Sequence, residues 1–423
     1  MPQNQETNIL NTDLRKPISS PFLIGHSVSE QEFFDSFKSG QFHHSWLITG
    51  PRGIGKATLA YRIIRYIFSL NNQDLISNLS LDTNLDVNKV AESSVSFDYD
   101  EEDDDDSDDN FSFSSSDLIV PENSEKKDLN KASVLQSLDN SPIKLSPKNP
   151  IFERLLAGGL TDLKIVEREY SDASKTKLKS EISVEQIRSL KEFFSKTSSE
   201  GGYKIALIDS VDDMNPNSSN ALLKILEEAP NKSLLILICN NYEGLLDTIK
   251  SRCRVLKLHP LSDENMTVLL HEYIENISDE DVKKLISLSH GSIGTALDFY
   301  NNNGIEISNM FYTSLPDILS KKNRAVLDIV TLVGNSEIKL NIFKDICITL
   351  LNNILRLNSN LSVTFASDIE ERTTKLCAKY FTNPDKIFKV REQLLSCFDL
   401  TQSLNLDYMA VIISSFERLK NAY

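Results

Sequence analysis

The sequence predicts an α/β domain built on a five-stranded parallel sheet, followed by a small helical domain and an all-helical C-terminal domain. Three observations indicate this fold class. Over residues 18–260, five short apolar runs typical of strands alternate with segments of helical periodicity. A glycine-rich turn joins the first of these runs to the first helix. From about residue 310 onward the apolar spacing is helical throughout.

The strand-like runs are Ser45–Thr49, Leu163–Glu167, Lys204–Asp209, Leu234–Cys239 and Val255–Leu258. Three of them are nearly continuous apolar segments instead of alternating apolar and polar ones. Strands of that composition are expected where helices cover both faces of a sheet, as in parallel α/β folds. We therefore expect a doubly wound domain.

Helical patterns separate the strands. Between residues 60 and 67, apolar side chains recur at the i, i+3, i+4, i+7 spacing of an amphipathic helix. Before the third strand, Ser183 and Gln186 have the spacing of a capping box. Between the third and fourth strands, Asn215 and Pro216 offer an N-cap and an N1 proline. Each signal predicts where a helix begins.

Composition divides the chain further. We expect an N-terminal tail over residues 1–17, the α/β domain over 18–260, a helical domain over 261–303 and a second helical domain over 304–423. The α/β domain is interrupted at about residues 71–147 by a segment rich in Ser, Asn and Asp, without sustained periodicity. We predict that this insertion is disordered.

The chain is acidic, with 45 Lys and Arg against 61 Asp and Glu and a formal net charge of −16. Ten of the acids lie in one run, Asp98–Asp109, so the remaining residues carry 51 acids against 45 bases. This balance argues against a protein that wraps nucleic acid through a basic surface of its own.

The five cysteines are widely spaced and never form a CxxC pair, so neither a disulfide framework nor a zinc ribbon is indicated. The first residues lack the apolar core of a signal peptide, and no apolar run approaches the length of a membrane span. We expect a cytoplasmic protein with no membrane association.

The strongest local motif is the turn GPRGIGK, which contains Gly50, Gly53, Gly55 and Lys56 and lies between a strand and a helix. In a phosphate-binding P-loop, backbone N–H groups and a helix N-terminus point into one concavity while lysine neutralises the terminal phosphates. The alternative is a glycine-rich turn kept only for its shape. The position between strand and helix favours the P-loop.

The metal-binding part of this motif is incomplete. Ala57 follows the lysine where a hydroxyl side chain would hold Mg²⁺, and Thr58 is one step further, about 100° around the helix. Asp209 ends the third strand as a Walker B aspartate would, although acids also commonly cap such turns. Ser210 follows it, where motor ATPases have a glutamate that polarises the attacking water.

Four segments together resemble, in order and spacing, the clamp-loader AAA+ proteins of bacterial DNA polymerase III. They are Phe42–Leu47, Gly50–Lys56, Asn220–Glu228 and the triplet Ser251-Arg252-Cys253. The likeness covers residues 20–300, whereas the C-terminal helices are supported by architecture alone. It implies a P-loop domain, a helical lid and a C-terminal collar that holds five subunits in a ring.

The resemblance assigns Arg252 as an arginine finger that points out of its own subunit at the γ-phosphate held by the neighbour. The alternative is a surface arginine paired with an acid of its own domain. Asn240 lies where the family places its sensor-1 polar residue, and an Asn-Asn pair at a strand end is equally typical of a turn.

Departures from the family pattern indicate the type of subunit. The γ/τ motor subunits have Thr after the P-loop lysine, Asp-Glu at Walker B and an arginine in a Gly-Ser-x-Arg motif. The corresponding residues here are Ala57, Ser210 and Gly294. The resemblance therefore implies a stator, a largely non-catalytic subunit between a γ/τ motor and the δ subunit.

Such a subunit helps the ring load the sliding clamp onto primed DNA during replication, at the nucleoid-associated replisome. We expect at most weak or structural binding of ATP or ADP. The family often carries a four-cysteine zinc module where the acidic insertion lies, and no such cysteines occur here, so we expect no zinc or other metal site. The alternatives are an active γ/τ-like ATPase or another P-loop enzyme, such as a kinase.

Overall fold

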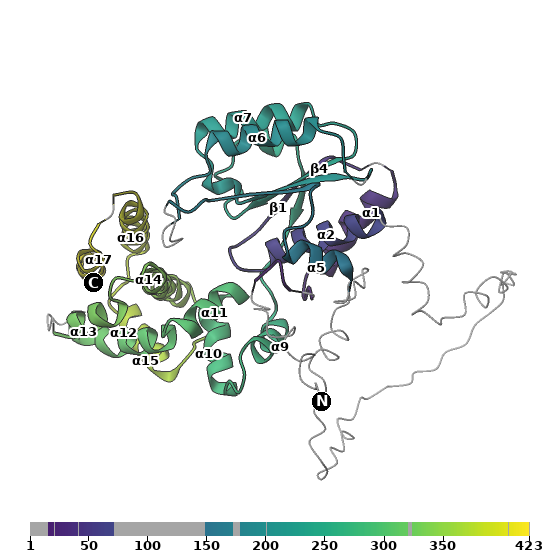
Figure 1. Ribbon diagram of the computed structural model, residues 1–423. Coiled ribbons are helices and arrows are strands. Elements are labelled where there is room, and N and C mark those ends of the chain that lie inside the picture. The colour runs from purple at the N-terminus through teal and green to yellow at the C-terminus, as the bar shows by residue number, and fades with distance from the viewer. Residues whose placement is uncertain are drawn as a thin grey trace, which may run out of the picture.

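The computed structural model describes residues 16–20, 22–40, 42–71, 149–171, 178–199, 201–319, 324–404 and 406–422. It shows a sheet domain and a helical region connected near residue 260 (Figure 1). Most of the predicted tail and the predicted insertion from residue 72 onward lie outside the described residues. Asn71, which we expected to begin the insertion, is the last residue of helix α2 (Lys56–Asn71).

The predicted five-stranded parallel sheet is confirmed, and its strand order is β2-β3-β4-β1-β5. The strands are β1 (Ser45–Thr49), β2 (Leu163–Glu167), β3 (Lys204–Asp209), β4 (Ser233–Cys239) and β5 (Arg254–Lys257). Two boundaries differ from the prediction by one residue. Strand β4 starts early because Ser233 pairs with Lys204, and β5 is shifted because Arg254 pairs with Trp46. Apolar patterning cannot detect such polar ends of a ladder.

Helices cover both faces of the sheet (Figure 1). Helices α1 (Ser27–Lys38), α2 and α5 (Pro150–Leu156) lie on one face, and α6 (Val184–Ser195) and α7 (Pro216–Glu227) lie on the other. Alternate residues of each strand point to opposite faces. In β3, for example, Ile205 and Leu207 pack towards α2, and Ala206 and Ile208 pack towards α6 and α7.

The predicted helix starts are confirmed. Ser183 and Gln186 form a complete capping box at α6, and the Asn215 side chain accepts from Ser218 N at α7, with Pro216 as its first residue. Two short elements complete the domain, the 3₁₀ turn η2 (Val211–Asp213) after β3 and α8 (Asp247–Lys250) before β5.

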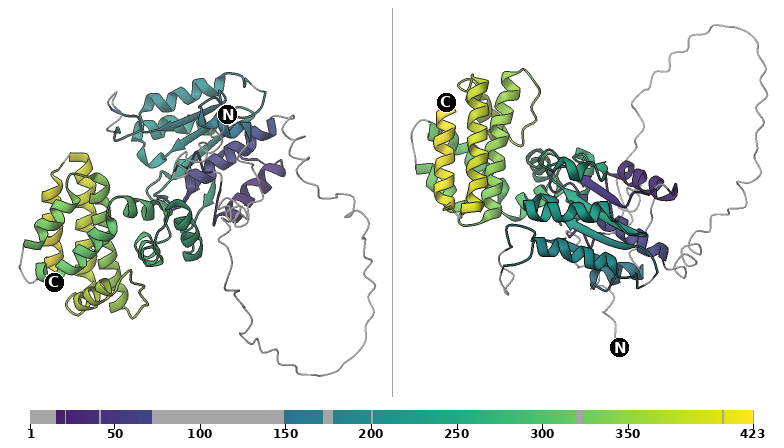
Figure 2. Two further views of the ribbon diagram at one scale, coloured as in Figure 1. Left: turned by 60° about the horizontal axis from the view of Figure 1, so that its bottom comes forward. Right: turned by 90° about the horizontal axis from the view of Figure 1, so that it is seen from above.

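The remaining chain is helical, as predicted (Figure 2). It consists of α9 (Asp263–Tyr273), α10 (Asp279–Ser289), α11 (Ile293–Asn301), α12 (Gly304–Leu319), α13 (Arg324–Val333), α14 (Glu337–Asn358), α15 (Asp368–Ala378), α16 (Pro384–Leu404) and α17 (Tyr408–Ala422). One continuous hydrophobic core runs from Leu261 to Leu419. His290, between α10 and α11, also reaches Thr349 of α14 at 3.2 Å. The division at residue 303 stays a prediction.

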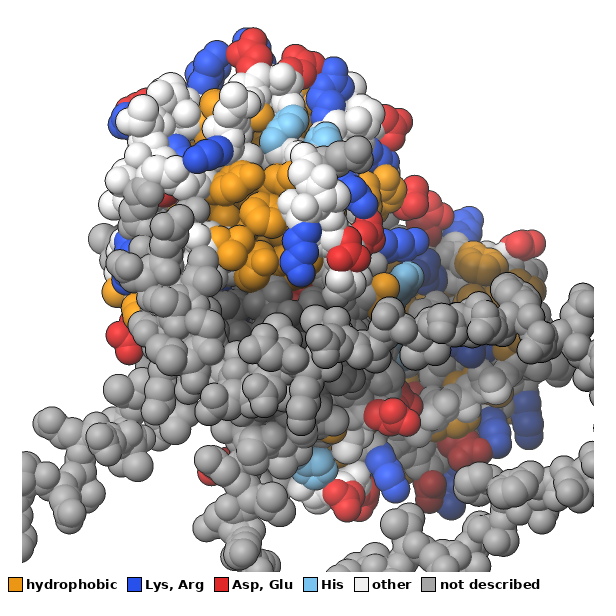
Figure 3. Space-filling model, turned by 90° about the vertical axis from the view of Figure 1, so that its right-hand side faces the viewer, with side chains coloured by type: hydrophobic (Ala, Val, Ile, Leu, Met, Phe, Trp, Pro, Cys, Tyr) orange, Lys and Arg blue, Asp and Glu red, His pale blue; other side chains and the backbone are white. Residues whose placement is uncertain are grey.

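An aromatic cluster lies where strands β1 and β3 begin. Phe37, Phe42, Trp46 and Tyr203 are linked by ring contacts between 4.9 and 6.2 Å. All but Trp46 are partly exposed. Figure 3 shows this end of the molecule, where hydrophobic side chains gather on the surface beside histidines. The opposite end of the sheet, at the carboxyl ends of the strands, carries the predicted P-loop.

Candidate functional site

The glycine-rich turn lies between β1 and α2, at the carboxyl edge of the sheet. Gly50, Gly53 and Gly55 all have positive φ angles, of 149°, 77° and 108°. Side chains disfavour this backbone region, so the turn needs glycine at these positions. At Gly50 a Cβ atom would also lie 2.5 Å from the Leu258 carbonyl oxygen.

Lys56 folds back onto the turn that precedes it. Its Nζ atom donates to the carbonyl oxygens of Gly50 at 2.7 Å and Pro51 at 2.5 Å, and the residue is 4% exposed. Burial lowers the pKa of the lysine from 10.5 to about 8, although Asp212 and Asp209 partly oppose this effect. Two backbone carbonyl groups therefore hold the lysine ammonium group against the turn.

The remaining carbonyl oxygens of the turn accept hydrogen bonds from three other parts of the chain. The pairs are Ser292 Oγ to Arg52 O at 2.8 Å, Gly294 N to Gly53 O at 2.9 Å, His26 Nε2 with Ile54 O at 2.7 Å, and Leu59 N to Gly55 O at 3.0 Å. All carbonyls from Gly50 to Gly55 therefore have donors within this chain.

The backbone N–H groups differ from the carbonyls. Those of residues 52, 53 and 55–58 donate to no acceptor in the described part of the chain. A row of such N–H groups at a helix N-terminus, with a lysine beside it, can hold a phosphate group. The turn therefore keeps the chemistry of a phosphate cradle.

His26 was not singled out from the sequence. It is 5% exposed, and its pKa is lowered, chiefly by burial and further by His259 and Lys56, against the hydrogen bond to Ile54 O. It lies just before α1, where no sequence motif marks it. Only its contact with the turn reveals a role in holding the P-loop.

The groups that would hold a metal ion and activate water are incomplete. Asp209 ends β3, and its pKa is raised by burial and by Glu167, although Lys56 and Arg52 partly oppose this. Ala57 and Thr58 lie in the first turn of α2, and both are partly buried. The alanine has no hydroxyl for a metal ion.

The side chains of Ser210 and Asn240 are hydrogen-bonded to each other. The Asn240 Nδ2 atom donates to Ser210 Oγ at 3.2 Å. Asp212, in η2, connects the two further, because its carboxylate accepts from Ser210 Oγ at 3.0 Å, from Asn240 N at 2.5 Å and from Asn241 N at 2.9 Å. The polar groups of this edge are thus tied to one another. Nothing in the sequence distinguished Asp212 from its acidic neighbour.

The predicted arginine finger lies near the amino ends of the strands, at the other end of the sheet from the P-loop. Strands β1 and β5 are parallel neighbours, with Trp46 paired to Arg254 and Thr49 to Lys257. The P-loop follows the carboxyl end of β1, whereas Arg252 precedes the amino end of β5. The four residues of β5 span roughly 13 Å at about 3.3 Å per residue. Arg252 therefore lies at the other end of these strands from the P-loop of its own chain.

Arg252 is 36% exposed and makes polar contacts within its own domain. Its Nη2 atom lies 2.6 Å from Glu227 Oε1, and its Nη1 atom donates to Thr248 O at 3.0 Å. The alternative weighed from the sequence, an ion pair with an acid of the same domain, is therefore present. A guanidinium has five N–H donors, so further donors remain for another acceptor.

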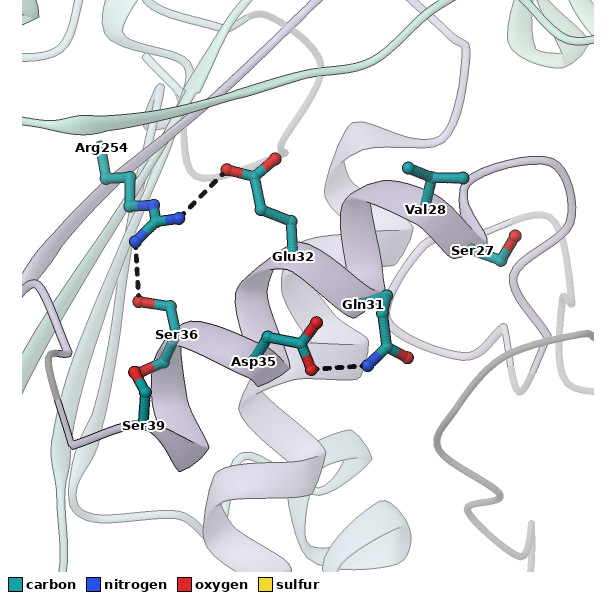
Figure 4. A pocket seen from close by; sticks show the side chains of 8 residues that line it. All are labelled: Ser27, Val28, Gln31, Glu32, Asp35, Ser36, Ser39 and Arg254. Atoms are coloured by element: carbon teal, nitrogen blue, oxygen red, sulfur yellow. Dashed lines mark hydrogen bonds and ion pairs between the residues drawn. The ribbon is translucent and has the colours of Figure 1, made fainter. Parts of the chain in front are cut away.

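Two surface hollows contain none of the predicted site residues. One lies beside edge strand β5, where Arg254 donates to Ser36 Oγ at 3.0 Å and lies 3.4 Å from Glu32 (Figure 4). The other lies between α6 and α7, and Arg188, Lys191 and Lys224 line it. Both are open surface features.

Within the described ranges, no three His, Cys, Asp or Glu side chains are grouped so that they could hold a metal ion. Nor does that part of the chain contain a helix long and apolar enough to span a membrane.

Comparisons with known proteins show that the chain is similar to subunits of DNA polymerase III. A family model described as "DNA polymerase III, delta subunit" matches residues 118–262. The chain is 37% identical over 143 residues to DNA polymerase III subunit delta′ of Pseudomonas aeruginosa, and 29% identical over 170 residues to that of Bacillus subtilis. These matches cover 34% and 40% of this chain, and 41% and 48% of those relatives. The chain thus spans less than half the length of each.

A longer match extends into the helical region. The chain is 26% identical over 322 residues to DNA polymerase III subunit gamma of Buchnera aphidicola, which covers 74% of this chain and 67% of that protein. The similarity to delta′ proteins is thus higher in identity, and the similarity to the gamma protein is longer.

Proposed function

Because this chain belongs to the delta′ and clamp-loader subunit family of DNA polymerase III, we propose that it acts as the δ′ stator of a clamp loader. In this role it lies between a γ/τ motor subunit and the δ subunit. It hydrolyses little ATP itself and supplies Arg252 to the nucleotide site of the neighbouring motor. The assembled ring then loads the sliding clamp onto primed DNA.

One observation carries this proposal. The P-loop and Arg252 lie at opposite ends of the neighbouring strands β1 and β5, so the arginine cannot serve the phosphate cradle of its own chain. An arginine directed outwards can stabilise the charge of a transferring phosphoryl group on another subunit. The location of Arg252 therefore supports action in trans.

The state of the chain's own site supports the same reading. Ala57 cannot bind Mg²⁺ through a hydroxyl, Ser210 cannot polarise water as a carboxylate would, and Gly294 carries no cation. Asn240, the candidate sensor-1 residue, uses its side-chain NH₂ group to donate a hydrogen bond to Ser210. Hydrolysis would have to proceed without three of its usual groups.

A second function has one specific observation in its favour. The N–H groups of residues 52, 53 and 55–58, which have no acceptor in the described part of the chain, and the side chain of Lys56 offer donors suited to the phosphates of ATP or ADP. We propose weak or structural nucleotide binding at this cradle. An active ATPase is the competing candidate.

Two measurements separate these functions. The first is steady-state ATP hydrolysis by the purified full chain, where we expect no sustained turnover. The second is size-exclusion chromatography of the chain with γ/τ and δ subunits, where we expect one complex containing all three. Sustained turnover by the chain alone would contradict the stator role, and failure to enter the complex would contradict clamp-loader membership.

A further inference from the structure

The helical region touches the P-loop through two glycines. A Cβ atom added at Gly294 would lie 2.8 Å from the Gly53 Cα atom, and one added at Gly53 would lie 3.1 Å from the Gly294 Cα atom. Both distances are shorter than ordinary contacts of a Cβ atom. The backbones of the P-loop and of α11 therefore pack directly against each other, without intervening side chains.

Hydrogen bonds fasten this contact. Gly294 N donates to Gly53 O at 2.9 Å, and Ser292 Oγ donates to Arg52 O at 2.8 Å. Because both acceptors are carbonyls of the turn, the bonds leave the N–H groups that would face a phosphate unused. Docking of α11 and occupation of the cradle thus use different sides of the same turn.

A second attachment lies at the loop before α11. Leu261 N donates to Gly291 O at 2.9 Å, and a Cβ atom at Gly291 would lie 2.6 Å from Leu261 O. Leu261 begins the segment that leaves the sheet domain. The loop before α11 is therefore held against both the P-loop and the connection between the two parts of the chain.

These contacts extend to the rest of the helical region. Ala296 and Phe299 of α11 belong to the hydrophobic core that continues to Leu419, and His290 reaches Thr349 of α14. An element that is fixed to the P-loop therefore shares one core with the C-terminal helices.

We propose that the Gly53–Gly294 contact is a latch that docks the helical region on the P-loop without nucleotide. A ligand shifts a conformational equilibrium only by its difference in affinity for the two states. Since docking here uses protein groups alone, ATP adds little to it. The latch is contained in one chain, so this inference goes beyond the proposed function and can fail independently of it.

Hydrogen exchange of the full chain tests the latch. The measured quantity is the exchange rate of backbone amides in the peptide that covers residues 290–300, with and without Mg·ATP. We expect protection of the Gly294 amide in the ligand-free chain and a change of less than about twofold on adding Mg·ATP. Slowing by about tenfold or more on adding Mg·ATP would overturn the proposal, because docking would then require nucleotide.

Substitution of the glycine provides the second test. In Gly294→Ala the methyl group meets the backbone of Gly53, so we expect amide exchange in α11 to accelerate by about tenfold or more. Alanine is a better helix former than glycine, and helix propensity alone would slow exchange instead. The two explanations therefore predict opposite signs.

Gly159→Ala is the matched control, because the nearest atom to its Cβ would be Arg154 O at 3.5 Å, an ordinary contact away from α11. We expect wild-type exchange in α11 for this variant. If Gly294→Ala exchanges like Gly159→Ala, the latch is refuted. If Gly294→Ala does not fold, the nucleotide comparison on the wild-type chain still decides the question.

Discussion

Arg252 and Glu227 form an ion pair between the loop after α8 and the last residue of α7, with Nη2 and Oε1 2.6 Å apart. Both side chains are substantially exposed, at 36% and 51%, and such pairs contribute little to stability in water. Glu227 therefore orients the guanidinium, and breaking this ion pair to bind another acceptor would cost little free energy. A phosphate group on a neighbouring subunit could replace the carboxylate.

The first prediction compares Arg252, the proposed arginine finger, with Lys56 of the predicted P-loop. In a reconstituted complex with γ/τ and δ, Arg252→Ala should lower DNA-stimulated ATP hydrolysis, because one motor site loses its finger. Arginine fingers contribute about 10³ to 10⁵ in rate, an upper limit since the other sites of the ring remain intact. Lys56→Met should leave this hydrolysis unchanged if the nucleotide site of this chain does not turn over, as proposed. Equal effects of the two variants would contradict the assignment.

A second prediction concerns pH. The Lys56 pKa is about 8 in the folded chain and 10.5 when unfolded, so between these values the unfolded state binds more protons. Below about pH 8 the buried charge lowers the free energy of unfolding by its full amount, and this destabilisation disappears as the pH rises to about 10.5. Wild-type stability should therefore rise with pH relative to Lys56→Met across that window. Urea unfolding of both proteins measures the difference, and a constant difference would show an unperturbed lysine.

The third prediction tests a buried carboxylate of the C-terminal helices. Glu370 is 1% exposed and accepts from Ala366 N at 2.8 Å on Oε2, and from Tyr312 Oη and Asn353 Nδ2 at 3.3 Å on Oε1. In Glu370→Gln the amide NH₂ group must face one of these donors. We expect a loss of about 1–3 kcal/mol in the free energy of unfolding.

Glu371→Gln is the control for this change, because its carboxylate is exposed and pairs with Lys375 one helical turn away. It should alter the free energy of unfolding by less than about 0.5 kcal/mol. Denaturant titration of both variants checks this, and similar losses would mean that the buried network contributes nothing specific.

The fourth prediction concerns the acidic insertion. Helices α2 and α5, which flank it, are packed together by contacts of their own, with the Arg65 guanidinium 5.0 Å from the Phe152 ring centre. The cost of closing a loop depends only weakly on its length. Replacing residues 75–145 by a short Gly/Ser linker should therefore preserve assembly with γ/τ and δ in a pull-down assay. Loss of assembly would assign a binding role to the segment.

The sequence allowed the sheet to be predicted because each strand is a short apolar run between helical patterns. Buried β4 illustrates this, since all of its residues are buried and most are apolar. Strand ends were less accurate, because Ser233 and Arg254 join the ladder through backbone bonds that side-chain patterns do not encode.

For the site, the sequence located the P-loop, Asp209 and Arg252, whose assignments stay predictions. It did not reveal how the P-loop is held. The bond from Ser292 to Arg52 joins residues 240 positions apart, and the neighbouring contact involves two glycines without side chains. Asp212 was missed for a related reason, since two of its partners are backbone N–H groups that follow another strand.

The helices after residue 260 share one hydrophobic core, and α11 of that group contacts the P-loop, so a rotation at this contact would be passed on to the C-terminal helices. Helix α14 alone has 22 residues and a length of about 33 Å. A tilt of about 5° over that length moves its far end by about 3 Å, which is comparable to the length of a hydrogen bond. Conversely, torque applied to those helices would be borne by the turn Gly50–Lys56, because α11 is hydrogen-bonded to it.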